Sequence, residues 1–495
     1  MKKFVFIAVA IILAAHSLHA KRQEVFGRSF MLIRPASYNI AMNEQLWHNF
    51  AYHKTGPDYG AFQLLPFYQH SNKRDKVARY FLINRKNELL VAGDNTDEDL
   101  VLDRDIRSEW LNLASDFSGK FSICPEQKQM GFTFMYNQGL QKFTDVDFLK
   151  EWNIGIEFPI LLVENNLNLC QRDLSMTSTE ANRQPDIISA LNQCDWNYAK
   201  WRPKAKMLIR PEKIKLTGGR SLMHRDYFQL ASSLSFTIPL TKRPDAEFVF
   251  DPVVGLDQHV AMGGAIHMQI LLNRDPERIA WTFFANLEGN FLIRNRQFRT
   301  YDLKNKPFSR YMLYTRKNSE PGEVIPGANL LTLESIVRPY GIADFSMGWR
   351  INVAPFEFEL GYDLYGFGGE KVKLRSSPIE SPFNRRCGGL NEFGIAGTGT
   401  VLNNGKLIQA TASNSTIDCL AADDTEFISI CENDLDLCSA AAGSVLNHKI
   451  HIAAGIESLG AHTEGFAGWG VFFEFPQKNA SLENWGFWLK LGAAF

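Results

Sequence analysis

Charged residues recur at every second position in several segments, and that spacing limits the chemistry they can do. In segment 356–364 the acidic residues Glu357, Glu359 and Asp363 alternate with bulky apolar residues, and Arg350 has an equivalent place in the preceding segment. Residues two apart on a strand share one face, so these side chains would form a polar surface opposite an apolar one. We expect that surface to line an aqueous passage.

Motifs for enzymatic or metal chemistry are absent from the sequence. It has no G-x-S-x-G elbow, Walker loop, H-E-x-x-H motif or complete EF-hand loop. The acidic run 94–99 could bind Ca²⁺ weakly, but it lacks the central Gly and terminal Glu, so a solvated turn is the stronger interpretation. His448 and His451 would point to opposite faces of a strand. We therefore predict no enzymatic activity and no cofactor.

Composition and the first residues narrow the class of protein. The 495 residues include 53 Lys plus Arg against 54 Asp plus Glu, which gives no reason to expect a nucleic-acid partner. Hydrophobic residues make up 45% of the chain and aromatic residues 12%, so much apolar surface must be placed somewhere. Residues 1–20 join two lysines to an apolar stretch, Phe4 to Ala15, and a possible cleavage site at Ala20, which is typical of a secretory signal peptide. No other stretch is long and apolar enough for a membrane helix.

Alternation with a period of two is the main structural signal. In segment 485–495 the residues Trp485, Phe487 and Leu489 share one face, while Lys490 and Gly492 lie on the other. Segments of this kind, with one aromatic face and one small or charged face, are the signature of transmembrane β-barrel strands. A soluble sandwich also alternates, but it does not require Gly and charges together on the polar face. Comparable segments are 260–272, 281–293, 345–353, 356–364, 450–456 and 469–475.

With its export signal, alternating strands and terminal Phe495, the chain resembles bacterial outer-membrane β-barrel proteins, either porin-like or similar to hydrophobic-compound transporters. The run from Lys490 through Gly492 to Phe495 fits the polar-x-Gly-x-x-aromatic assembly signal of that class. The resemblance implies location in the bacterial outer membrane. It implies outer-membrane lipid, the barrel-assembly machinery and a small solute as partners, and it leaves a homo-oligomer open.

We predict an all-β fold, a transmembrane antiparallel up-and-down β-barrel of about 14 strands within a range of roughly 12 to 16. With both termini on the periplasmic side, the long connections fall outside and the turn at Ala354-Pro355 falls inside. The expected division is a signal peptide (1–20), a periplasmic or plug segment (21–58) and a barrel (59–495) with a long outer loop (366–448). Weaker upstream strand candidates are 79–91, 106–113 and 120–124.

The strand phase assigns a set of side chains to the lumen. If Ala354-Pro355 is a two-residue turn, Arg350 faces Glu359. In the same register Asn352 faces Glu357, so part of the wall is neutralised. Mixed charges argue against a strongly ion-selective filter. The predicted pore-lining residues are Glu357, Glu359, Asp363, Arg350, Glu288, Asn290, Arg294, Arg296, His267, Gln269 and Lys490.

Cysteines and the N-terminal segment carry two further expectations. An exported chain favours disulfides, and the candidates are Cys387, Cys419, Cys431 and Cys438 in the outer loop and Cys170 and Cys194 upstream, with connectivity open. In segment 21–58, Ser37 could cap a short helix whose apolar face includes Ile40, Trp47 and Phe50. This segment could be a hatch inside the barrel or a loosely ordered periplasmic lead-in.

We expect an outer-membrane channel or porin for passive passage of small solutes or hydrophobic compounds. The alternative is a surface adhesin or structural barrel whose disulfide-clamped outer loops bind a partner. A membrane-embedded hydrolase would need a Ser, a His and an acidic or amide residue that converge on the outer wall, and the sequence cannot show such a convergence.

Overall fold

The fold is taken from a computed structural model of the chain. It describes residues 24–45, 60–72, 74–144, 146–177, 183–273, 279–316, 324–375, 393–395, 415–419, 429–459 and 464–495. The predicted signal peptide, residues 1–20, lies outside the described residues.

Twelve antiparallel strands form a closed barrel, which confirms the predicted fold class. Neighbours in sequence are neighbours in the barrel, and the first strand pairs with the last. Two hydrogen bonds between the backbones of Gly60 and Phe495, both 2.8 Å, close this seam. The strands are β1 (Gly60–Asn72), β5 (Glu126–Gly139), β6 (Trp152–Asn166), β9 (Lys213–Arg225), β10 (Phe228–Pro239), β11 (Ala261–Leu271), β12 (Ala280–Leu292), β18 (Ile342–Val353), β19 (Phe356–Phe367), β23 (Val445–Leu459), β24 (Glu464–Pro476) and β25 (Glu483–Ala494).

The barrel exposes a continuous apolar exterior. On β25 the side chains of Trp485, Phe487 and Leu489 are 39 to 49% exposed, while Trp488 and Lys490 between and beside them are fully buried. The same alternation runs along β19, β23 and β24. A soluble protein does not tolerate so large an exposed apolar surface, and the hydrocarbon of a bilayer covers it here. The chain is thus an outer-membrane type of barrel, located in the bacterial outer membrane.

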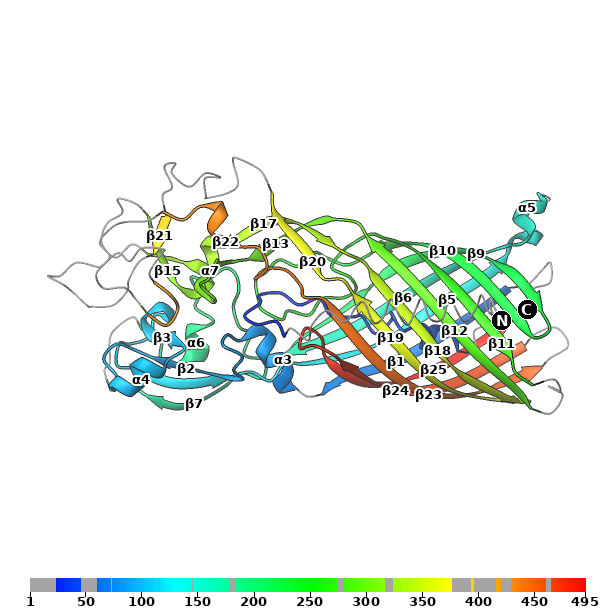
Figure 1. The fold of residues 1–495 in the computed structure, drawn as a ribbon, viewed down its shortest axis with the longest axis horizontal. Coiled ribbons are helices and arrows are strands. Elements are labelled where there is room, and N and C mark those ends of the chain that lie inside the picture. Colours follow the sequence, from blue (N-terminus) through cyan, green and yellow to red (C-terminus); the bar gives the residue numbers. More distant parts are fainter. Residues whose placement is uncertain are drawn as a thin grey trace, which may run out of the picture.

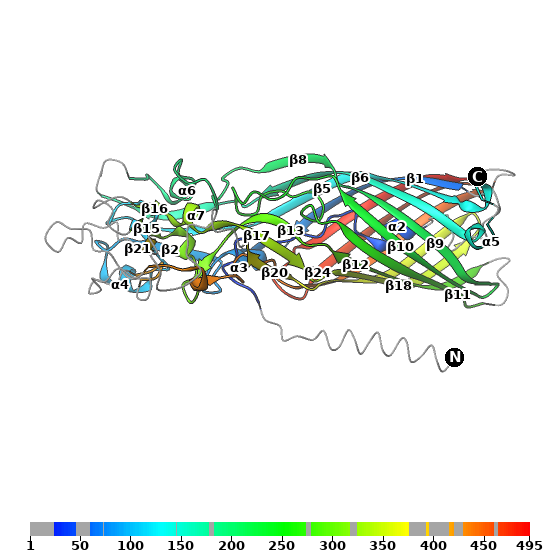
Figure 2. The ribbon, with the colours of Figure 1, turned by 90° about the horizontal axis from the view of Figure 1, so that it is seen from above.

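All the long connections gather at one end of the barrel, and the short ones lie at the other (Figure 1). The end that carries the C-terminus has the turn at Ala354-Pro355 and the helix α5 (Asp147–Lys150). The opposite end carries a folded body, which we call the outer region, and Figure 2 shows the same separation from above. Within the described residues, no helix has the length and apolarity needed to cross a membrane.

The outer region accounts for the error in the predicted strand number. The candidates 79–91, 106–113 and 120–124 are not barrel strands. The first begins in the last turn of helix α3 (Arg74–Phe81) and ends in β2 (Glu88–Ala92). β2 pairs with β3 (Ile106–Arg107) and β4 (Ser118–Ser122) in a sheet of four short strands completed by β7 (Cys170–Ser175). β8 (Lys206–Pro211) pairs with β6 beyond the closed ring. Twelve strands is the lower end of the predicted range of 12 to 16, and two below its central value of 14.

The other connections contribute three small sheets and several helical turns to the outer region. One sheet contains β13 (Asn295–Thr300), β17 (Thr332–Pro339) and β20 (Glu370–Leu374). The others are β14 (Asp302–Leu303) with β22 (Leu435–Asp436), and β16 (Ile325–Pro326) with β15 (Leu313–Arg316) and β21 (Phe393–Ile395). The helices of this region are α4 (Glu98–Asp103), α6 (Ile187–Ala190) and α7 (Gly327–Leu330), with 3-10 turns at Ser108–Leu111, Ser309–Tyr311 and Glu432–Asp434. Two further elements lie elsewhere: α2 (Ile40–Glu44) lies in the N-terminal segment, and the 3-10 turn Leu140–Lys142 lies between β5 and β6, beside α5.

The outer region has a hydrophobic core of its own. Trp110, Trp196 and Trp201 are at most 2% exposed and belong to one cluster of buried side chains there. Trp196 stacks on Tyr311 with 5.4 Å between ring centroids, and the Trp201 indole donates to the Tyr311 hydroxyl at 2.6 Å. Part of the aromatic residues therefore packs in the core of the outer region, and not on the outer wall of the barrel.

Candidate functional site

The inward face of the barrel is the best candidate for a functional site, because charged side chains converge there. Strands β18 and β19 pair in the predicted register, with Arg350 opposite Glu359 and Asn352 opposite Glu357. The Arg350 guanidinium lies 2.8 Å from the Glu359 carboxylate and 3.2 Å from that of Glu357. All three side chains are at most 7% exposed. One guanidinium thus bridges two carboxylates on the next strand and neutralises part of their charge.

His451 continues this network on β23. Its Nε2 lies 3.0 Å from Glu359 and its Nδ1 lies 3.3 Å from Asp363, and the side chain is fully buried. Lys449, two residues earlier, lies 3.7 Å from Asp363. His448 points away from the lumen, where its Nδ1 lies 2.6 Å from the Tyr362 hydroxyl. The two histidines thus occupy opposite faces as predicted and form no metal pair.

A second charged group lies further along the wall, on strands β6, β9 and β12. Lys215 on β9 reaches Glu288 on β12 at 2.7 Å, although two strands separate them. The inward residues in between, including Ser233 and Ala265, are small and leave room for this contact. Lys213 pairs with Glu157 at 3.0 Å. Small side chains on two strands therefore allow ion pairs to form across the curve of the wall.

Residues 34–45 of the N-terminal segment contact these inward faces. The Arg34 guanidinium binds Asp344 on β18 at 2.6 Å and Glu474 on β24 at 3.4 Å, and it stacks over the Tyr365 ring at 4.4 Å. Its side chain is only 6% exposed. Since Asp344 and Glu474 stand on strands that are not neighbours, Arg34 bridges two parts of the wall.

Helix α2 and the residue after it lie deeper in the lumen. The Lys490 ammonium donates to the backbone carbonyls of Asn43, at 3.2 Å, and of Gln45. The Trp488 indole donates to the Gln45 side chain at 3.0 Å, and Glu44 lies 3.7 Å from His267. The helix is capped by Asn39. The predicted cap Ser37 donates instead to Glu212, while Trp47 and Phe50 lie outside the described residues.

Residues 25–30 belong to the outer region. The backbone of Val25 exchanges two hydrogen bonds with the Asn479 side chain, at 2.9 and 2.7 Å. The backbone N–H of Arg28 donates to Tyr80, and that of Ser29 donates to Ser439. These partners lie on three different outer connections. Within the described residues the segment therefore runs from the outer loops, at residues 25–30, into the lumen, at residues 34–45, so residues 25–30 do not lie on the periplasmic side.

The predicted pore-lining residues do not all lie in the barrel. The inward positions include Glu357, Glu359, Asp363, Arg350, His267, Asn290 and Lys490, which are all at most 7% exposed, and the partly exposed Glu288 and Gln269. Arg294 and Arg296 were placed wrongly. β12 ends at Leu292, and these two side chains are exposed on the outer region instead. The alternation shifts by one residue after Ile293, and the sequence pattern gave no sign of that shift.

The residues of the predicted assembly signal lie at the closing seam. Phe495 pairs through its backbone with Gly60, and its side chain is 51% exposed. A Cβ on Gly492 would stand 2.2 Å from the Phe466 ring, so this position requires Gly. Lys490 points into the lumen. Their recognition by assembly machinery stays a prediction.

The structure does not form most of the proposed disulfides. Cys124, Cys170, Cys194, Cys419 and Cys438 are free thiols on the exposed surface. Cys170 and Cys194 are therefore not bridged, and neither are Cys419 and Cys438. Cys431 is disulfide-bonded, and Cys387 lies outside the described residues. The sequence argument failed here because cysteine number and compartment do not fix the distances between thiols.

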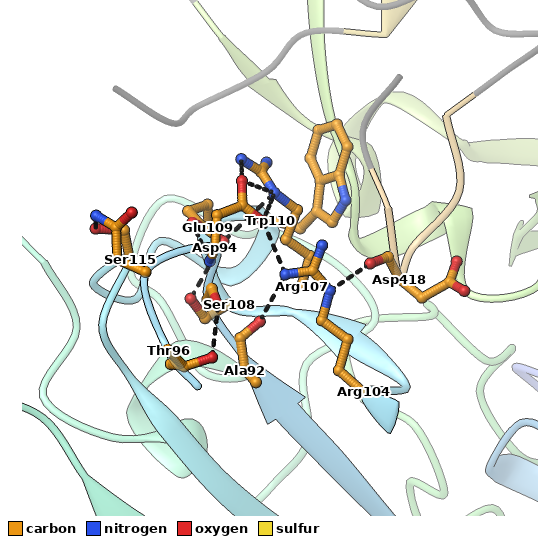
Figure 3. Close-up of polar contacts among 12 residues, drawn as sticks. Ala92, Asp94, Thr96, Arg104, Arg107, Ser108, Glu109, Trp110, Ser115 and Asp418 are labelled. Carbon is orange, nitrogen blue, oxygen red and sulfur yellow. Dashed lines mark hydrogen bonds and ion pairs between the residues drawn. The ribbon is translucent and has the colours of Figure 1, made fainter. Parts of the chain in front are cut away.

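The acidic run 94–99 has a structural role in the outer region (Figure 3). Asp94 accepts two hydrogen bonds from the buried Arg107, the shorter at 2.6 Å, and another from Arg104 at 2.7 Å. Burial acts to raise the pKa of Asp94, but the two arginines hold that pKa below its ordinary value. Asp97 and Glu98 are exposed at the start of α4. The run therefore anchors a turn to two arginines, and no Ca²⁺ site is needed to explain it.

Several residues of the lumen network are not in the predicted set. Asp344 and Lys215 could have been found, because they continue the polar alternation of β18 and β9. Arg34 has no such signal, since the residues around it form neither a strand nor a helix. Its position depends on the whole barrel being closed around it.

No known family model and no curated protein sequence matches this chain. Among solved structures, it is similar to the transport unit of the autotransporter AIDA-I from Escherichia coli, with 8% identity, a TM-score of 0.35, and coverage of 92% of this chain and 94% of that one. For a Pseudomonas aeruginosa FadL homologue the values are 7%, 0.31, 95% and 99%, and for the Pseudomonas putida toluene transporter TodX they are 8%, 0.31, 95% and 99%. At these TM-scores the likenesses fix neither a family nor a function.

Proposed function

We propose that the chain is an outer-membrane channel for passive passage of small solutes or hydrophobic compounds, closed by its own residues 34–45. The observation that carries this proposal is the placement of these residues against the inward face of the barrel. An eight-stranded barrel is filled by its side chains, while about 16 strands leave an open aqueous channel. Twelve strands lie between these cases, so a lumen of this width has room for an added segment.

The contacts of the segment suit a removable plug. Residues 34–45 are held by polar anchors, chiefly Arg34 near the outer end and the Lys490 contacts deeper down. The wall pairs Arg350–Glu359 and Lys215–Glu288 each join two strands of the barrel. When the segment leaves, those wall charges stay neutralised, and the wall that remains is polar and mixed in charge. Such a wall would favour weak selectivity among small solutes.

Conductance in a planar bilayer tests this proposal. We expect the refolded wild-type chain to conduct rarely, and the double variant Arg34→Ala with Lys490→Met to show frequent open-channel steps because both anchors are lost. Lys215→Met is the matched control, since it removes a lumen cation whose carboxylate partners Glu288 and Glu157 belong to the wall. A double variant that keeps the heat-modifiable mobility of a folded barrel but remains silent would contradict the proposal.

The second candidate function is a surface adhesin or structural barrel, and the size of the folded outer region favours it. A cavity of about 290 Å³ lies where this region meets the barrel, lined by Phe30 and Met31 of the segment and by Phe248 and Phe250. If the outer region binds a partner and the barrel only anchors it in the membrane, the outer region needs a rigid core and the barrel need not conduct. Loss of partner binding on deletion of the outer connections, together with silence of every lumen variant, would favour this function.

A further inference from the structure

The sheet β13–β17–β20 has a strongly basic outer face. Its inner face buries Arg299, Val337 and Val372. The outer face exposes Arg296, Arg338, Lys371 and Lys373, and Arg294 is exposed just before β13 begins. We call these five cations the basic face. It includes the two arginines that the sequence had assigned to the lumen.

Strand register crowds these cations together. Arg338 is directly opposite Lys371, and both Arg296 and Lys373 are opposite Ile336. Side chains directly opposite on neighbouring strands lie about 5 Å apart, where like charges destabilise a sheet. Within the described residues, none of the five makes an ion pair, and the acid on this face, Glu334, is already paired with Arg375. An anion from outside the chain would relieve this repulsion.

An apolar groove lies on the barrel wall directly below the basic face. Four small residues, Gly264, Gly289, Ala343 and Gly366, follow one another in register across β11, β12, β18 and β19. They face outward, and the groove they form has a volume of about 870 Å³ with Leu234 at one side and Leu446 at the other. Since the groove opens on the lipid-facing wall, hydrocarbon chains are what surrounds it.

The groove and the basic face are joined by one stretch of backbone. Tyr340 lines the outer end of the groove, and its N–H donates to Gly369 at 3.0 Å. Arg338 precedes Tyr340 by two residues, and the usual rise of a strand puts the two residues about 7 Å apart. Lys371 follows Gly369 at the same spacing. The cations therefore lie at the level where the headgroups of the outer leaflet begin. They are just above a groove that can hold a hydrocarbon chain.

We propose that this surface binds a phosphorylated lipid of the outer leaflet, with an acyl chain in the groove and its phosphate on the basic face. A soluble anion would use the cations alone and would leave the groove unexplained. A neutral lipid would use the groove alone and would leave five unpaired cations in contact. The combination fits an anionic amphiphile, since juxtamembrane cations attract anionic lipid by about 1 kcal/mol each.

Binding of bisphosphorylated lipid A to the full chain in neutral detergent, measured by native mass spectrometry, tests the phosphate half. The variant Arg338→Gln with Lys371→Gln and Lys373→Gln should bind about 10- to 100-fold more weakly. The control is Arg225→Gln with Lys204→Gln and Lys242→Gln, which removes three exposed cations elsewhere and should bind like the wild type. Equal affinity of the two triple variants would overturn the proposal. Displacement of lipid A by millimolar inorganic phosphate would assign the cations to a soluble anion instead, which also overturns it.

The acyl half is tested by filling the groove. A Cβ on Gly289 would meet no atom within 4 Å, so Gly289→Leu fits without strain and occupies the slot. Gly465 is equally open and lies on the outward face of β24 away from the groove, which makes Gly465→Leu the matched control. We expect about a tenfold loss of lipid A binding for Gly289→Leu and none for the control. Unchanged binding of the Gly289 variant, with its barrel mobility intact on a gel, would show that no chain enters the groove.

Discussion

The barrel and the outer region are built from the same residue types but by opposite arrangements. In the barrel, large apolar side chains such as Trp469 and Phe358 face outward and are about half exposed, while charges such as Asp363 and Lys490 are buried inside. In the outer region, Trp201 is buried and Asp97 is exposed, as in a soluble protein. The comparison shows that the average composition of a chain does not reveal its surroundings. Here a bilayer surrounds one part of the chain and water surrounds the other.

The test of this comparison with the largest expected effect replaces one tryptophan in each region by alanine. Trp201→Ala should destabilise the outer region by about 3–5 kcal/mol, because it empties a packed core site and removes the bond to Tyr311. Trp469→Ala should have a much smaller effect, because lipid replaces the lost side chain. Limited proteolysis reports the outer region, and heat modifiability on a gel reports the barrel. Similar proteolysis rates for the two variants would break the comparison.

A second test concerns the buried arginine of Figure 3. Asp94→Asn should destabilise the outer region by about 1.5–3 kcal/mol, because it removes the charge-assisted bonds to the fully buried Arg107. Asp97→Asn, in the same turn but exposed, is the control and should have no measurable effect. The readout is the urea midpoint of protease sensitivity. If the two variants behave alike, the acidic run is a solvated turn after all.

A third test uses pH. Burial raises the pKa of Asp257 to about 8 even though Arg299 lowers it, and the residue lies in the outer connection before β11. Because the folded state holds this proton above the ordinary value of 3.8, stability is greatest at low pH and falls as pH rises through about 8. We expect a loss of at least about 1.4 kcal/mol, one pKa unit, between pH 5 and pH 9.

Thermal melts of the outer region at the two pH values measure this loss, and Asp257→Asn should abolish most of the difference. A wild-type protein that is as stable at pH 9 as at pH 5 would show that Asp257 is not buried in the protonated state. The barrel mobility on a gel should not change between these conditions.

The smallest expected effect belongs to a surface ion pair. Arg172 contacts Glu88 at 2.7 Å, but the arginine side chain is 58% exposed. Arg172→Gln should therefore lower the urea midpoint only slightly, and 0.5 M NaCl should erase most of that difference. A loss as large as that of Asp94→Asn, measured by the same urea midpoint, would mean that exposure does not govern ion-pair strength in this region.

The sequence predicted the barrel far better than the outer region, and the reason is physical. A strand between lipid and lumen must alternate, so the register of Arg350 with Glu359 could be deduced from the turn alone. The outer region has strands of two to eight residues and a core drawn from distant connections, so alternation there is short and local. Arg296 shows where the barrel pattern stops. The sequence analysis continued the alternation of β12 beyond the end of that strand and so assigned Arg296 to the lumen. Arg34 shows the other limit, since its partners come from 300 or more residues away in the chain.

The course of the N-terminal segment sets the order of events in biogenesis. Residues 25–30 are bonded among the outer connections, residues 34–45 lie in the lumen, and β1 starts again at the periplasmic end. A segment held inside a closed cylinder cannot have entered it sideways through the wall. The seam between β1 and β25 is where the first and last strands meet, so we expect the cylinder to shut around a segment already laid inside it. The last strand to be synthesised would then seal in the first residues to be exported.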